Sequence, residues 1–209
     1  YYLSKFNKNQ SILISGESGA GKTQSTKIII DYLTYLSNPT ANANANANAN
    51  ANPNANDSKT SSIQSKIIHA NPIVEAFGNA KTIKNDNSSR FGKFIKLYFD
   101  NNSNHICGGT IETFLLEKVR VIKQNGRERN FHIFYEFLNG ASQEIRNHLQ
   151  FNKFFNKNDS YLSNGSMDCD ADNFHNLSKL LYSIGVDHDK QYDVWKIITF
   201  IIVMSEYSY

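Results

Sequence analysis

The sequence predicts an α/β fold, with a mixed, mainly parallel central sheet flanked by helices and a helical C-terminal part. Three observations predict it. An apolar run at residues 11–15 leads through a glycine-rich turn into an amphipathic segment at 22–36. Strand-like segments follow at 94–99 and 106–121. Helical patterns then recur from residue 131 onward.

The composition supports a folded domain and argues against several classes of partner. Hydrophobic residues make up 40% of the 209 and charged residues 20%, which suits one large or two small domains. A net charge of +3 is too small to indicate nucleic acid or an anionic membrane. Two cysteines cannot form a disulfide framework, and the longest apolar stretch, 197–204, is far shorter than the ~20 residues that span a bilayer. We therefore expect a cytoplasmic protein with no nucleic-acid partner and no membrane span.

The first predicted elements form half of an α/β unit. Residues 11–15 are too few for a helix, and their apolar character suits a buried parallel strand. The segment after the glycines predicts a helix with one buried face, because its apolar residues recur at steps of three and four: Ile28, Ile29, Tyr32, Leu33 and Leu36.

Residues 37–62 interrupt this pattern with a polar, repetitive stretch. Asn accounts for 28 of the 209 residues, and Ala and Asn alternate strictly over 41–52. A period of two is typical of strands, but Ala and Asn disfavour strands and bury little surface. We predict a disordered surface loop, with a β-aggregating segment as the alternative.

The remaining elements are assigned from periodicity and turn residues. Helices are expected at 63–68, from Pro72 to 77, and at 131–138, 143–149, 174–184 and 192–205. Polar loops are expected at 81–89 and 156–173, and a hairpin turn at 101–104. Gly185 is the expected C-cap of the helix that precedes it.

One segment has the pattern of a phosphate-binding loop. It matches G-x-x-x-x-G-K-[S/T] with Gly16, Glu17, Ser18, Gly19, Ala20, Gly21, Lys22 and Thr23. Glycines let backbone N–H groups converge on phosphate oxygens, and the helix that follows offers its N-terminus to the same anion. Lys22 can reach the β- and γ-phosphates, and Thr23 can ligate Mg²⁺. A chance glycine turn is the alternative, but the flanking strand and helix patterns favour a P-loop that binds a nucleoside triphosphate.

Residues 16–23 resemble the P-loop of the myosin motor domain letter for letter, and further motifs follow in the family's order. Residues 71–82 are similar to the helix and turn that lead into myosin switch I, and residues 85–93 resemble switch I itself. Kinesins also have Ser-Ser-Arg here but continue with Ser-His, so Phe91-Gly92 favours myosin. Residues 113–121 resemble the segment after switch I, with Val119 where Ser is usual.

This resemblance implies roles for individual residues in binding ATP and Mg²⁺. Ser89 would supply a second hydroxyl to Mg²⁺ beside Thr23, and Asn85 and Ser88 would contact phosphate or the attacking water. Arg90 would close the pocket through an ion pair with a glutamate of switch II. The implied catalytic residues are Lys22, Asn85, Ser88, Ser89 and Arg90; the implied nucleotide-binding residues are Asn85 and the eight P-loop residues, and the implied metal ligands are Thr23 and Ser89.

The resemblance also implies an ATP-driven motor that acts on actin filaments in the cytoskeleton. The strand and helix of the P-loop would occupy 1–36, and the Asn-rich loop at 37–62 would be the family's variable surface loop. Switch I and central-sheet strands would occupy 63–130, and the helical start of the upper actin-binding subdomain 131–209.

The sequence lacks the family's switch II pattern, Asp-Ile-x-Gly-Phe-Glu, so we expect an incomplete motor domain. Arg90 would lack its closing partner, and the chain alone is expected to hydrolyse ATP slowly or not at all. Binding of light chains is not expected from this segment. The alternative is a nucleotide-binding or interaction fragment without motor activity.

Overall fold

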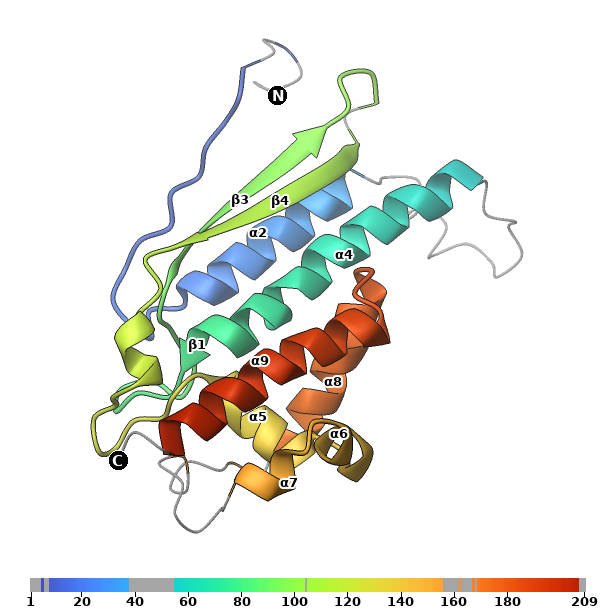
Figure 1. Cartoon of the computed structure of the whole chain (residues 1–209). Helices are drawn as coiled ribbons and strands as arrows, with labels where there is room; N and C mark the ends of the chain where they lie inside the picture. Colours follow the sequence, from blue (N-terminus) through green and yellow to red (C-terminus); the bar gives the residue numbers. More distant parts are fainter. Residues whose placement is uncertain are drawn as a thin grey trace. The chain divides into compact units, whose positions relative to one another are not determined.

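The computed structural model describes residues 5, 8–37, 55–103, 105–155, 162, 167 and 169–206. They form helices and small antiparallel sheets (Figure 1). The chain divides into two compact units, and each is described by itself. The first unit is Tyr1–Ile68 with Lys93–Thr113, and the second is His69–Gly92 with Phe114–Tyr209.

In the first unit, a helix packs against a β-hairpin (Figure 1). Helix α2, Lys22–Leu36, lies along strands β3, Gly92–Phe99, and β4, Ile106–Phe114, which are hydrogen-bonded to each other. Their shared core is made of Ile30, Ile67 and Ile106, with Leu33, Ile95, Leu97 and Phe99 packed around them. The predicted helix and hairpin are confirmed, but the predicted buried face of the helix is wrong. Ile28, Tyr32 and Leu36 are exposed, and the buried residue of α2 is Ile30, which faces the hairpin and Ile67.

The predicted strand at residues 11–15 is wrong. The segment has no regular secondary structure, and its Ile12 and Leu13 side chains are 64% and 92% exposed. A strand needs a neighbouring strand to take up its hydrogen bonds, and in the described part of the chain β3 and β4 pair only with each other. The described residues therefore contain no mainly parallel central sheet; their helices and small antiparallel sheets fit part of an α/β domain.

Helix α4, Ala55–Gly78, is longer than the sequence suggests. It begins within the predicted loop at 37–62, of which residues 38–54 lie outside the described residues, and it continues through Pro72. We expected Pro72 to begin a helix, because proline lacks the N–H that an interior position donates. Burial on both sides of the proline offsets that lost bond, since Ile67 enters the core of the first unit and Ile73 that of the second.

The second unit is largely helical, as predicted for the C-terminal part. Its helices are α5, His132–Gly140; α6, Gln143–His148; α7, Phe151–Phe154; α8, Asp170–Ser183; and α9, His188–Glu206. The centre of its core is aromatic: the ring of Phe174 lies 5.9 Å from that of Phe137 and 4.9 Å from that of Trp195, centroid to centroid. Among the described helices, none combines the length and the apolar character needed to cross a membrane.

Gly185 ends α8 as predicted. Its φ of +100° is a left-handed conformation that favours glycine. The N–H of Gly185 donates to the carbonyl of Tyr182 (3.0 Å), and that of Val186 donates to the carbonyl of Leu181 (2.9 Å). These two bonds make a Schellman motif, which satisfies carbonyls at the end of the helix. The turn lets the chain reverse into α9.

Two short elements shape the loop that carries the predicted switch I residues. Strand β1, Asn79–Ala80, pairs antiparallel with β2, Ser88–Ser89, and so closes the loop between them. The strand predicted for 106–121 ends at Phe114, because Leu115 has a left-handed φ of +56°. A short 3-10 helix, η2, Lys118–Val121, follows in place of the predicted strand.

Candidate functional site

The glycine loop 16–23 forms a turn that leads directly into α2. Gly19 and Gly21 both have a φ of +83°, so the backbone conformation itself favours glycine at these positions. An added Cβ would meet nothing within 4 Å at either position, so the space beside them is open. Gly21 is also the N-cap of α2, and no described side chain caps the helix there. A helix N-terminus of this kind, reached through left-handed glycines, suits an anion.

Lys22 points back over this loop. Its ammonium donates to the carbonyls of Gly16 (2.6 Å) and Glu17 (2.7 Å). A lysine ammonium has three N–H donors, so these two bonds leave a third. The positive charge thus lies over the turn that also presents the helix N-terminus. Lys22 and Thr23 are half-buried, whereas the rest of the loop is exposed to solvent.

The second predicted segment, around Asn85, is shaped by its own hydrogen bonds. The Asn85 carbonyl accepts from the backbone N–H (2.8 Å) and the hydroxyl (3.1 Å) of Thr82. Its side-chain oxygen accepts from the N–H of Asn87 (3.0 Å). The Asn85 side chain therefore also stabilises the turn, and its amide nitrogen is the group with which it could contact a phosphate.

His132 is a residue of this region that sequence reasoning missed. Its Nε2 lies 3.1 Å from the side-chain oxygen of Asn87, which also accepts from Asn79 Nδ2 (2.8 Å). Burial and the nearby charge of Arg129 lower the pKa of His132 to about 4. The ring is therefore neutral at neutral pH, and because the amide oxygen only accepts, Nε2 carries the hydrogen.

Ser88 and Ser89 point to opposite sides of β2. Ser88 is buried, with 3% of its surface exposed, and Ser89 is exposed. This alternation is the pleat of a strand. The Ser88 hydroxyl oxygen accepts from Arg90 Nη1 at 3.2 Å.

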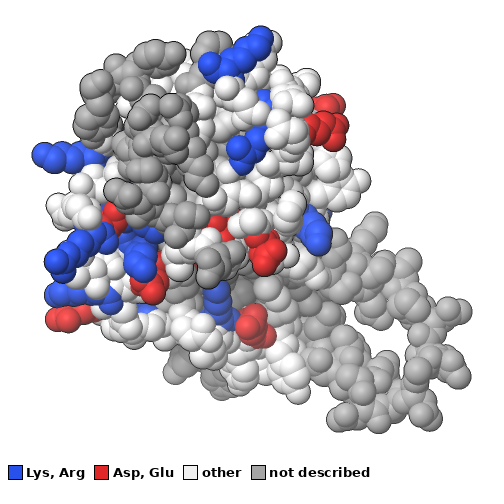
Figure 2. Space-filling model, turned by 90° about the horizontal axis from the view of Figure 1, so that it is seen from below, with Lys and Arg blue, Asp and Glu red and all other residues white. Residues whose placement is uncertain are grey.

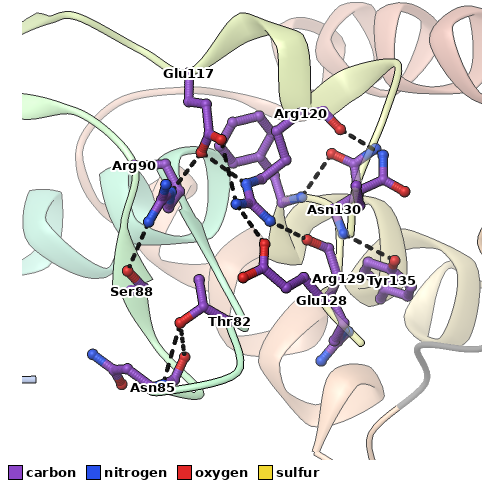
Figure 3. A network of polar contacts seen from close by, with 12 residues as sticks. Thr82, Asn85, Ser88, Arg90, Glu117, Arg120, Glu128, Arg129, Asn130 and Tyr135 are labelled. Carbon is purple, nitrogen blue, oxygen red and sulfur yellow. Dashed lines mark hydrogen bonds and ion pairs between the residues drawn. The ribbon is translucent and has the colours of Figure 1, made fainter. Parts of the chain in front are cut away.

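Arg90 has a partner within the chain, contrary to our expectation. Its Nε donates to Glu117 Oε2 at 2.5 Å (Figure 3). The backbone of the same two residues is joined as well, since the N–H of Glu117 donates to the Arg90 carbonyl (2.9 Å). The expected partner, a glutamate of switch II, is not needed to give this guanidinium a counter-ion.

Glu117 belongs to a wider ion-pair network (Figure 3). Arg120 Nε donates to Glu117 Oε2, and Arg120 Nη2 donates to Glu128 Oε2, both at 2.9 Å. Burial acts to raise the pKa of Glu117, but the hydrogen bonds from Arg90 and Arg120 outweigh it and lower the pKa below its usual value. The Arg120 side chain is only 4% exposed, and the carboxylates of Glu117 and Glu128 neutralise its buried charge. A signal was present in the sequence: the run predicted as strand ends in a group of charged residues, Glu117, Lys118 and Arg120.

A second, fully buried pair lies in the same unit. Arg129 Nη2 donates to both carboxylate oxygens of Asp170 at 2.9 Å, and the two side chains are 4% and 2% exposed. The ring of Tyr135 stacks on the guanidinium, 4.0 Å from its centre. Glu136 is buried nearby, and its Oε2 has no hydrogen-bond partner among the described residues. Burial and the negative charge of Asp170 raise the pKa of Glu136 to about 7.

One face of the molecule carries charges of both signs. Figure 2 shows basic and acidic side chains interspersed on the described part of the face in view, with no continuous patch of either sign. No group of three or more metal-binding acidic, histidine or cysteine side chains is gathered among the described residues. Of the two hydroxyl residues predicted as metal ligands, Thr23 lies in α2 of the first unit and Ser89 in β2 of the second.

Comparison with known proteins matches a single family over nearly the whole chain. The family model described as "Myosin head (motor domain)" matches residues 2–209. The chain is 41% identical over 202 residues to "Myosin-I heavy chain" of Dictyostelium discoideum, covering 93% of this chain and 8% of that protein. It is 40% identical over 207 residues to "Myosin-1" of Saccharomyces cerevisiae, covering 97% of this chain and 10% of that protein. The chain thus spans about a tenth of the length of these relatives.

Proposed function

Since the chain belongs to the myosin head (motor domain) family, we propose that it binds Mg-ATP as part of an actin-based motor. The observation that carries the proposal is the turn at 16–23. Left-handed glycines, an uncapped helix N-terminus and the Lys22 ammonium come together there. This combination is complementary to a chain of phosphates, whose oxygens are negative and only accept hydrogen bonds.

Each residue has a defined part in the proposed site. Backbone N–H groups of Gly19 and Gly21 would donate to phosphate oxygens, and Lys22 would offset the charge of the β- and γ-phosphates. Thr23 and Ser89 would ligate Mg²⁺, which when bound neutralises charge that develops on the phosphates. Ser88 and Asn85 would donate to phosphate or hold the attacking water.

A fluorescent ATP analogue with Mg²⁺ tests nucleotide binding by the whole chain. Lys22→Ala should lose most of the affinity, because it removes the cation closest to the glycine loop. Lys66→Ala is the matched control, since Lys66 is an exposed helical lysine of the same unit. Equal binding by the wild type and Lys22→Ala would reject the P-loop assignment.

We further propose that this chain binds ATP but hydrolyses it slowly or not at all. Arg90, which the family resemblance pairs with a glutamate of switch II, is engaged by Glu117 instead. Steady-state ATPase measurements on the chain test this, and turnover at the rate of a complete motor would refute it. Slow turnover would also agree with the alternative function, a nucleotide-binding fragment without motor activity.

Actin filaments are the proposed partner of such a motor. The helical part from residue 131 would contribute to that surface. Co-sedimentation with actin filaments, with and without Mg-ATP, tests this partner. Binding that nucleotide weakens would support it.

A further inference from the structure

We propose that Glu117 is a positioning residue of the nucleotide site, because it holds the Arg90 guanidinium that in turn orients the Ser88 hydroxyl. The inference rests on the proposed function. It adds to the site a residue that lies outside both phosphate-binding segments, 16–23 and 85–90.

Glu117 fixes Arg90 at two points. Its carboxylate accepts from Arg90 Nε at 2.5 Å, and its backbone N–H donates to the Arg90 carbonyl at 2.9 Å. A third bond, from the N–H of Arg90 to the carbonyl of Gly78 (2.9 Å), holds the other side of the same residue. The backbone bonds therefore set where Arg90 lies, and the carboxylate sets the direction of its guanidinium.

The direction of this guanidinium matters for Ser88. Arg90 Nη1 donates to the Ser88 oxygen at 3.2 Å. Because a guanidinium has donors only, the Ser88 oxygen is the acceptor in this bond, and its own hydrogen is directed to another group. Phosphate oxygens accept hydrogen bonds and cannot donate them. Arg90 thus holds Ser88 as a donor, which is the role that a phosphate contact requires.

Glu117 is itself held in place by Arg120. The Arg120 Nε bond to Glu117 (2.9 Å) comes from a guanidinium that is 4% exposed and paired on its other side with Glu128. If the Glu117 carboxylate turned away, this buried cation would lose one of its two counter-ions, which is unfavourable. A buried cation therefore keeps the carboxylate directed at Arg90.

The chain offers a matched pair of variants to test this. Glu117→Gln and Glu128→Gln each remove one carboxylate charge from Arg120, but only Glu117 contacts Arg90. Binding of the fluorescent ATP analogue with Mg²⁺ should weaken by about three- to tenfold in Glu117→Gln, because a neutral amide oxygen accepts from Arg90 more weakly than a carboxylate does. Glu128→Gln should bind as the wild type does. In a Ser88→Ala background, Glu117→Gln should cause no further loss, because its effect passes through that hydroxyl.

The outcomes separate this proposal from the proposed function. If the wild type and Lys22→Ala bind alike, both are overturned. If Lys22→Ala loses binding but Glu117→Gln does not, the P-loop assignment stands and the positioning role is rejected. Equal losses in Glu117→Gln and Glu128→Gln, or additive losses with Ser88→Ala, also reject it, since they indicate a general effect on the fold. Should Glu117→Gln fail to fold, Arg90→Lys removes the same Nη1 donor, and the same loss of affinity is expected.

Discussion

Burial of Glu136 should make its own contribution to the stability of the second unit fall as the pH rises towards neutral. Its ordinary pKa of 4.5 is raised to about 7 in the folded chain, first by burial and then by Asp170. Between these two values the folded protein keeps a proton that the unfolded chain has lost. The contribution of Glu136 to the free energy of unfolding therefore falls as the pH rises through this window, and the fall ends above the folded pKa.

The size of this effect follows from the shift. At 1.36 kcal/mol for each pKa unit, the shift corresponds to about 3 kcal/mol. Glu136→Gln cannot ionise, so its free energy of unfolding should gain about 3 kcal/mol relative to the wild type between pH 4.5 and pH 7.5. Any fixed cost of the added amide is the same at every pH and cancels in this comparison. The titration of His132 also cancels, because both proteins contain it.

Urea unfolding at a series of pH values measures this directly. The single tryptophan, Trp195, is 2% exposed in the core of the second unit, so its fluorescence reports on the unit that contains Glu136. Glu144→Gln, at an exposed position on α6, is the matched control and should follow the wild-type profile. A difference between Glu136→Gln and the wild type that stays constant from pH 4.5 to pH 7.5 would refute the reasoning.

Two further predictions concern packing and charge in the same unit. Gly140→Ala should destabilise the fold by about 1–3 kcal/mol, since the new Cβ would lie 2.4 Å from Phe174 Cβ and 2.9 Å from the Ala171 carbonyl oxygen. Thermal unfolding checks this, with Gly126→Ala, whose Cβ would meet nothing within 4 Å, as the tolerated control. Asp170→Asn should cost about 3–5 kcal/mol, because it leaves the buried Arg129 without its counter-ion. Asp193→Asn breaks only an exposed pair, so urea unfolding should show a change of at most about 1 kcal/mol; equal costs for the two variants would contradict the prediction.

Several elements could be predicted because their causes are local. Gly185 ends α8 with a left-handed backbone, and the helix at 22–36 follows directly on its glycine turn, although its buried residue is Ile30 and not the predicted face. The hairpin between β3 and β4 follows from its polar turn, where Asp100 accepts from the N–H and the hydroxyl of Ser103. Each of these features depends on residues close to one another in sequence.

Other elements depend on distant residues, and there the predictions differ from the structure. The apolar run 11–15 has the composition of a strand, but a strand requires partners. Helix α4 continues through Pro72 because burial on both sides supports it. The chain after Phe114 leaves the strand at Leu115 and places Glu117 between Arg90 and Arg120. The charged residues at 117–120 indicate a departure from a regular strand, but Arg90, the partner that matters for the second segment, lies 27 residues away in sequence.

The sequence by itself determined the family, and it predicts the phosphate-binding loop. The order of residues 16–23 matches a motif whose chemistry is carried by backbone geometry and by one lysine, and both are encoded within eight positions. Only the tertiary structure decided the charges and protonation states around residues 85–90 and in the core of the second unit. The partner of Arg90, the neutral state of His132 and the raised pKa of Glu136 all depend on burial and on charges brought together from distant parts of the chain. Electrostatic interactions strengthen as water is excluded, and which groups lose their water is a property of the folded chain.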